Sequence, residues 1–108
     1  DTDTYIEFTG DQIRIIAGGK PLIHAEESTI DTVIINDGSN NLDFRVEGLN
    51  DEHLIFSDGS TDRVGIGSAI PQAKLDVNGT LNVAGILTAA TANVTGTLTA
   101  GLIDGGTY

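Results

Sequence analysis

The sequence predicts an all-β protein whose strands need partners from other chains. Short runs of Ile, Val, Phe and Thr alternate with turns of Gly, Asn and Asp, which tolerate the backbone angles of tight hairpins. A second stretch keeps a period of two residues, which is the period of extended chain, for about 30 residues. Large core-forming residues are scarce, because the 108 residues include three Phe, two Tyr and no Trp or Met.

The first half of the chain has the pattern of short strands joined by tight turns. Strands are predicted at residues 5–9, 12–17, 32–35, 42–47 and 53–56. The run at 42–47 alternates apolar and charged residues, which is typical of a strand with one buried face. Only residues 25–30 have a helical composition, and they are too few to form a stable helix.

Two turn sequences echo one another within this half. Residues 35–39 read I-N-D-G-S and residues 56–60 read F-S-D-G-S, and each set follows an apolar run. Each is followed by an acid, Arg, Val and Gly, at 43–48 and at 62–65. We interpret the echo as two copies of one hairpin unit with variable spacing.

Charge and composition divide the chain into three segments. Residues 1–64 contain 14 acids and 4 bases, a net charge of −10, whereas residues 65–108 contain 2 acids and 1 base, a net charge of −1. We predict an acidic β-hairpin repeat region at 1–64, a Gly/Pro junction at 65–72 and a Gly/Ala/Thr-rich β shaft at 73–108. The absence of an initiator Met indicates a segment of a longer protein.

The same composition excludes several kinds of partner and site. A chain without Cys has no disulfide framework and no thiolate metal site. A net charge of −11 disfavours binding to nucleic acid and to anionic membranes, both of which need clustered Lys and Arg. Apolar runs of only a few residues cannot span a bilayer.

The period-two stretch predicts an interface between chains. Small or apolar residues fall on odd positions from 73 to 89 and on even positions from 90 to 102, so the pattern changes phase once. A lone strand of this kind has no core of its own, and its free edges would promote aggregation. Three such stripes can meet at one axis without leaving a pore. The predicted trimer-core residues are Leu75, Val77, Leu81, Val83, Leu87, Val94, Leu98 and Leu102.

Residues 58–79 carry a resemblance to a known family. Their sequence, D-G-S-T-D-R-V-G-I-G-S-A-I-P-Q-A-K-L-D-V-N-G, resembles a junction of bacteriophage tail fibres and related virion appendages. In those proteins a D-R-V-G-I-G-T-x-x-P-x-x-K-L-x-V-x-G run precedes Gly/Thr-rich shaft repeats, and Ser68 stands here where Thr is usual. The runs at 43–48 and 53–56 are similar to the repeats that precede this junction.

The resemblance implies an elongated, intertwined homotrimeric β fibre, with short hairpin units followed by a β-prism or triple-β-spiral-like shaft. It implies a structural role, as a shaft or connector that supports host attachment, in a virion outside the cell. The partners implied are copies of the chain itself, other virion tail or capsid proteins and a host surface glycan, without nucleic acid, membrane or cofactor. A trimeric bacterial surface adhesin segment and a polysaccharide-degrading tailspike fragment are the alternatives.

No catalytic, cofactor or metal site is predicted, although several residues were weighed for one. His24 or His53 could act as a base beside Asp51 or Glu52, but we interpret both as ordinary polar residues of strands or turns. Pairs of acids arise by chance in so acidic a chain. The oxygen-rich runs at 36–41 and 58–62 lack the terminal bidentate Glu of a calcium loop, and we interpret them as turns.

Two further groups of side chains are assigned structural roles. Arg45 and Arg63 each lie next to an Asp in the sequence, which suggests structural ion pairs. The aromatic residues of the first half could present a sugar-binding platform, but we expect them to form its core because aromatic side chains dominate small cores. These residues are Tyr5, Phe8, Phe44 and Phe56.

Overall fold

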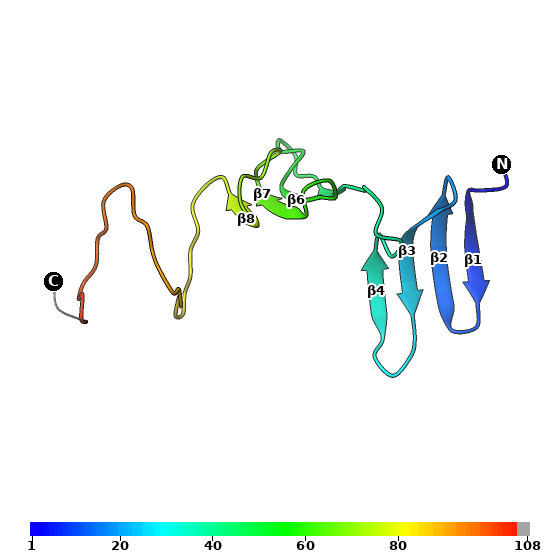
Figure 1. Ribbon diagram of the computed structural model, residues 1–108, viewed down its shortest axis with the longest axis horizontal. Helices are drawn as coiled ribbons and strands as arrows, with labels where there is room; N and C mark the ends of the chain where they lie inside the picture. Colours follow the sequence, from blue (N-terminus) through cyan, green and yellow to red (C-terminus); the bar gives the residue numbers. More distant parts are fainter. Residues whose placement is uncertain (106–108) are drawn as a thin grey trace.

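The chain folds into two four-stranded sheets that follow one another along an elongated molecule (Figure 1). The structure is a computed structural model that describes residues 1–105. Over these residues it is all-β, without a helix, which confirms the predicted fold class. Its radius of gyration is 19.9 Å, whereas a compact domain of about 100 residues has a radius of gyration of about 13 Å. Among these residues, no helix has the length and apolar character needed to cross a membrane.

The first sheet contains four antiparallel strands in the order of the sequence. They are β1 (Tyr5–Thr9), β2 (Gln12–Ala17), β3 (Lys20–Glu26) and β4 (Thr32–Ile35). Gly10, Gly18 and Gly19 have φ angles of 57°, 56° and 70° in the two hairpin turns, where glycine avoids the strain of a side chain. The strands β1, β2 and β4 match their predictions.

Strand β3 was not predicted, because its first residues look like a break. Pro21 follows two glycines and a lysine, and proline cannot donate a hydrogen bond to a strand ladder. The structure accommodates it with an irregularity: Ile15 pairs with Ile23 and Ile16 pairs with Pro21, so that Leu22 is the extra residue. A bulge of this kind is a usual place for proline in a strand.

The second sheet is built from shorter strands and ends in a parallel pair. It contains β5 (Phe44–Val46), β6 (Ile55–Asp58), β7 (Arg63–Ile66) and β8 (Leu75–Val77). The first three are antiparallel, and β8 lies parallel to β7. Strand β6 runs to Asp58, later than predicted, because the turn that follows it lies at 59–62. Strand β7 crosses from the predicted repeat region into the predicted junction.

The two echoed turns do not form two copies of one hairpin. The second lies in the β6–β7 hairpin, as expected, but the first ends β4 and leads into the loop between the two sheets. Asn36 causes this difference: its side-chain amide donates to the carbonyl of Asn40 (2.7 Å) and its Oδ1 accepts from the backbone N–H of Asn40 (2.8 Å). These bonds close the chain into a loop, with Asn36 at φ 68°.

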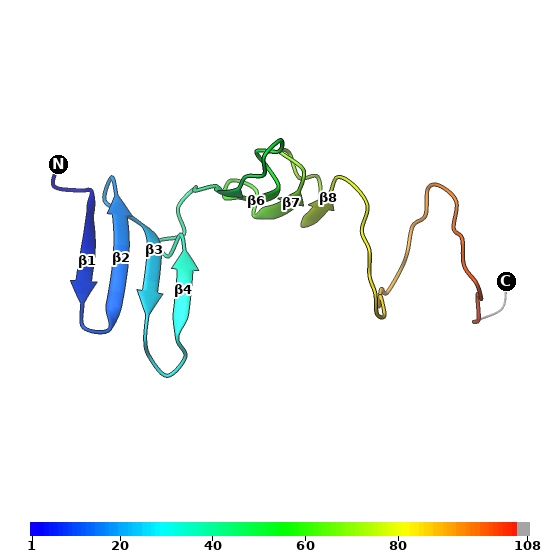
Figure 2. The same cartoon turned by 180° about the vertical axis from the view of Figure 1, so that it is seen from behind.

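Residues 78–105 contain no strand in the structure of the single chain. This segment runs away from the sheets as a bent, extended chain (Figures 1 and 2). Of the predicted period-two stretch, only Leu75–Val77 is paired within the chain. A strand needs a hydrogen-bonding neighbour, and the pairing of this segment between chains stays a prediction.

Candidate interaction surfaces

One face of the first sheet carries only apolar side chains. The register of the four strands aligns them in two rows that run across the sheet. The first row is Ile6, Ile15, Ile23 and Ile35, and the second row is Phe8, Ile13, Ala25 and Val33. We call these eight residues the two-row face.

The two-row face is uncovered in the single chain. Phe8 and Val33, on the outer strands, are 75% and 73% exposed, and Ile6 beside Phe8 and the three isoleucines of the inner strands are exposed as well. Apolar surface that is contiguous and uncovered marks a place of interaction. A sheet that presents such a face needs something to pack on it.

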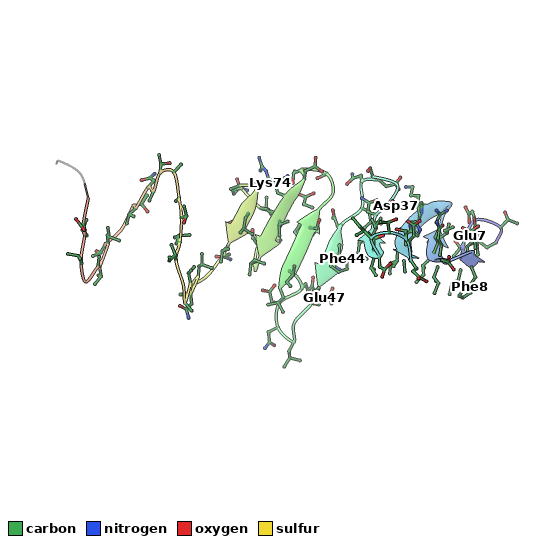
Figure 3. All side chains as sticks on the ribbon, turned by 90° about the horizontal axis from the view of Figure 1, so that it is seen from below. Glu7, Phe8, Asp37, Phe44, Glu47 and Lys74 are labelled. Atoms are coloured by element: carbon green, nitrogen blue, oxygen red, sulfur yellow. The ribbon has the colours of Figure 1, made fainter. Side chains whose placement is uncertain are left out.

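The opposite face of the same sheet is mostly polar and internally paired, apart from a row of Tyr5, Ile16 and Pro21. Arg14 lies 3.7 Å from Glu7, and the side-chain amide of Gln12 donates to Glu26 at 3.0 Å. Figure 3 shows Glu7 and Phe8 on opposite sides of β1, as the alternation of a strand requires. The first sheet is therefore amphipathic, with one face suited to water and the other to a protein partner.

The predicted trimer-core residues are also uncovered in the single chain. Seven of the eight are exposed, and Val77 is partly buried, where β8 pairs with β7. The two large apolar residues that are buried are Ile16 and Phe56, one in each sheet. The aromatic residues differ from the expectation of a shared core, because Phe56 is buried while Tyr5, Phe8 and Phe44 are exposed.

The junction motif holds β8 beside β7 through close backbone packing. Gly65 is buried, and a Cβ atom at this position would lie 2.5 Å from the carbonyl oxygen of Ser68 and 3.1 Å from Cγ of Pro71. Pro71 is fully buried, and its carbonyl accepts a hydrogen bond from Nη1 of Arg63 at 3.0 Å. The glycine, the proline and the arginine of the motif thus form one packed unit.

Side chains of the motif also fix the loop between the two strands. Oδ2 of Asp76 accepts hydrogen bonds from the hydroxyl of Ser68 (3.1 Å) and from the backbone N–H of Gln72 (3.0 Å). Nδ2 of Asn78 donates to the carbonyl of Gly67 at 3.0 Å. Ser68 meets this need with its hydroxyl, as the Thr usual at that position would. These bonds join β8 and the residues on either side of it to the loop that follows β7.

The arginines make contacts other than those suggested by their sequence neighbours. Arg45 lies 3.0 Å from Glu47 and 3.9 Å from Glu52. Arg63 bonds a carbonyl, as described above, in place of an aspartate. Asp43, two residues before Arg45, accepts a hydrogen bond from the backbone N–H of Gly59 at 3.0 Å. This bond ties the loop between the two sheets to the β6–β7 turn.

The two histidines make different local contacts. The backbone N–H of His53 donates to Asp51 at 2.8 Å, while its ring packs edge-on against Phe56 with 4.9 Å between the ring centroids. His24 is 4% exposed, and its Nδ1 lies 2.9 Å from Oδ2 of Asp37. Its Nε2 is buried without a hydrogen-bond partner among the described residues, so the ring has no nitrogen open to a substrate. Sequence reasoning missed this pair because Asp37 is distant from His24 in the chain.

In the acidic turn at 58–62, the carboxylate of Asp58 accepts hydrogen bonds from side chains of the turn itself. Asp58 accepts hydrogen bonds from the hydroxyls of Ser60 (2.6 Å) and Thr61 (2.7 Å), which lower the pKa of its carboxyl to about 2. A hollow of about 290 Å³ lies between the two echoed turns and is lined by both. Within residues 1–105, no group of three or more His, Asp or Glu side chains is placed to hold a metal ion.

Comparison with known proteins adds no relative to this description. No family model matches the chain, and no curated protein or solved structure is significantly similar to it.

Proposed function

We propose that this chain is a structural segment, a shaft or connector, of a bacteriophage tail fibre or another virion appendage, and that it supports host attachment as a homotrimer. One observation carries the proposal: the single chain leaves most of its apolar side chains uncovered. Two large apolar residues are buried, while the two-row face and seven of the eight predicted trimer-core residues are exposed. A core shared between chains would bury both sets.

The junction supports the same proposal. The residues that resemble the appendage motif are those that bond or pack β7 against β8, which favours a mechanical role over a chemical one. The connection leads from two sheets into a long extended segment (Figure 2). An extended segment with small, alternating side chains suits a slender shaft, in which chains approach closely.

The surface chemistry fits an extracellular appendage. With 16 acids and 5 bases the chain repels nucleic acid and anionic membranes, so the proposed partners are other copies, neighbouring virion tail or capsid proteins and a host surface glycan. We propose no cofactor and no catalytic role. An enzymatic tailspike fragment is disfavoured by the closed surroundings of His24.

Sedimentation equilibrium of the chain tests the assembly. The proposal predicts a mass of about 34 kDa, three times the 11.2 kDa of one chain. A folded species of 11.2 kDa at micromolar concentration would contradict it.

Electron microscopy tests the location. A gold-labelled antibody against this chain should mark the appendages of the virions that carry it. Label on a bacterial cell envelope, in the absence of virions, would favour the adhesin alternative instead.

A further inference from the structure

We propose that the two-row face of the first sheet is a contact surface between copies of this chain, with Phe8 of one copy packed over Ala25 of the next. The inference rests on the proposed homotrimer, but it places an interface outside the segment for which the sequence predicted one. It would join the chains along the first sheet as well as along residues 73–108.

The size of the two-row face fits a protein partner. Six of its side chains expose between 37% and 75% of their surface, which amounts to on the order of 600 Å² if a large apolar side chain offers about 150–200 Å². A stable contact between proteins buries about 800 Å² on each partner.

The charges around the face favour a second copy over other partners. The two rows contain no charged side chain, so two copies can meet there without placing like charges opposite one another. The rim is acidic, with Asp11, Glu26, Glu27 and Asp31 at one end. This rim repels an anionic membrane surface, whereas the uncharged rows suit an equally uncharged apolar surface such as that of a second copy.

The shape of the face is complementary to itself. Phe8 projects from β1 and is the most exposed residue of the two rows. In the same row, Ile13, Ala25 and Val33 line a shallow, open hollow of about 360 Å³, whose outer end is lined by the four acidic residues of the rim. Because one face carries both a projecting aromatic ring and a hollow, each copy can place its ring in the hollow of one neighbour and receive the ring of the other.

This arrangement closes into a ring of three. Strands β1 and β4 form opposite edges of the sheet, so Phe8 and the hollow lie toward different edges. Three sheets placed around an axis bring the β1 edge of each beside the β4 edge of the next. Such a head-to-tail contact, repeated by rotation, forms a closed cyclic trimer.

Disulfide trapping tests the contact, since the chain has no cysteine of its own. The variant carries Phe8→Cys and Ala25→Cys together, and the control carries Thr9→Cys with Ala25→Cys, because Thr9 lies on the opposite face of β1. A bond within one chain is excluded: β2 separates β1 from β3, which places the two Cα atoms about 10 Å apart, whereas a disulfide needs less than about 7 Å.

We expect the first variant, once oxidised, to run as a covalent trimer on a denaturing gel without reductant, and the control to run as single chains. If the first variant also runs as single chains while sedimentation shows a trimer, the trimer is held elsewhere and this inference is wrong. If the unmodified chain sediments as a monomer, the proposed function itself fails. Linked dimers from Phe8→Cys alone would indicate a two-fold contact and would also overturn the inference.

A charge substitution provides an independent measurement. Phe8→Asp should weaken self-association at least about 100-fold, because three unpaired carboxylates would be buried, whereas Thr9→Asp should change it less than threefold. Phe8 is exposed in the single chain, so Phe8→Asp acts on the contact between chains, and circular dichroism should show folded structure lost only together with association. Equal effects of the two substitutions would contradict the proposal.

Discussion

The two sheets differ in the contacts that stabilise them. The first has strands of four to seven residues and one wholly apolar face. The second has strands of three or four residues, but buried Gly65 and Pro71 and the bonds of Asp76 and Asn78 fasten it from within. The first sheet therefore depends on a partner for its apolar face, and the second depends on contacts that one chain supplies.

The two kinds of stabilising contact lie in different parts of the molecule. Close backbone packing and side-chain hydrogen bonds fasten β7, β8 and their connecting loop to one another, directly before the extended segment. Contacts between chains are expected on either side of this junction. A fibre segment gains from such an arrangement, because a rigid connector sets the direction in which the shared shaft begins.

The largest expected effect of a single change within the chain is at Gly65. Gly65→Ala should destabilise the second sheet by about 3 kcal/mol, because its Cβ would lie 2.5 Å from the Ser68 carbonyl and the backbone would have to move. Urea denaturation followed by circular dichroism measures the loss. Gly101→Ala is the matched control, since open space surrounds Gly101, and it should change stability by less than about 0.5 kcal/mol. Equal stability of the two variants would show that the junction is not tightly packed.

A smaller effect is expected at Asp76. Asp76→Ala should cost about 2 kcal/mol, because the hydroxyl of Ser68 and the N–H of Gln72 lose a shared acceptor. Asp104→Ala, in the exposed final segment, serves as the control. Faster hydrogen exchange confined to β7 and β8 would support the assignment, whereas faster exchange in the first sheet would show that the two sheets are not stabilised separately.

The smallest effect concerns pH and the β6–β7 turn. The pKa of Asp58 lies at about 2, below its ordinary value of 3.8, because the hydroxyls of Ser60 and Thr61 donate to it. The contribution to stability is therefore fully present above about pH 4 and is lost as the pH falls toward 2. Titration of the carboxyl by NMR should give the low pKa, and Ser60→Ala with Thr61→Val should return it toward 3.8. An unchanged pKa in that double variant would rule out the hydroxyls as the cause.

Local patterns in the sequence predicted much of the first sheet, but not how its strands align. In each strand, apolar residues occupy every second position, as Ile6 and Phe8 or Ile13 and Ile15 do. This pattern is enough to indicate an apolar face once all four strands are known. It was missed because β3 was read as a turn, which left a gap in the middle of the sheet. The bulge that admits Pro21 is set by pairing with β2 and has no signature in β3 alone.

The second sheet was less predictable, because its organisation is not local. The parallel pairing of β8 with β7, the close approach at Gly65 and the acceptor role of Asp76 all join residues across a loop. The motif drew attention to residues 58–79, but spacing alone does not show which residue bonds to which. The His24 and Asp37 pair escaped prediction for the same reason.

The central claim, that copies of the chain share the apolar core that one chain lacks, is tested most directly by thermal unfolding at different concentrations. Circular dichroism of the intact chain should be followed over a hundredfold range of concentration. Association stabilises the folded state by mass action, so the account predicts an unfolding midpoint that rises steadily with concentration. A cooperative transition with the same midpoint at every concentration would mean that one chain folds by itself, and would contradict the account.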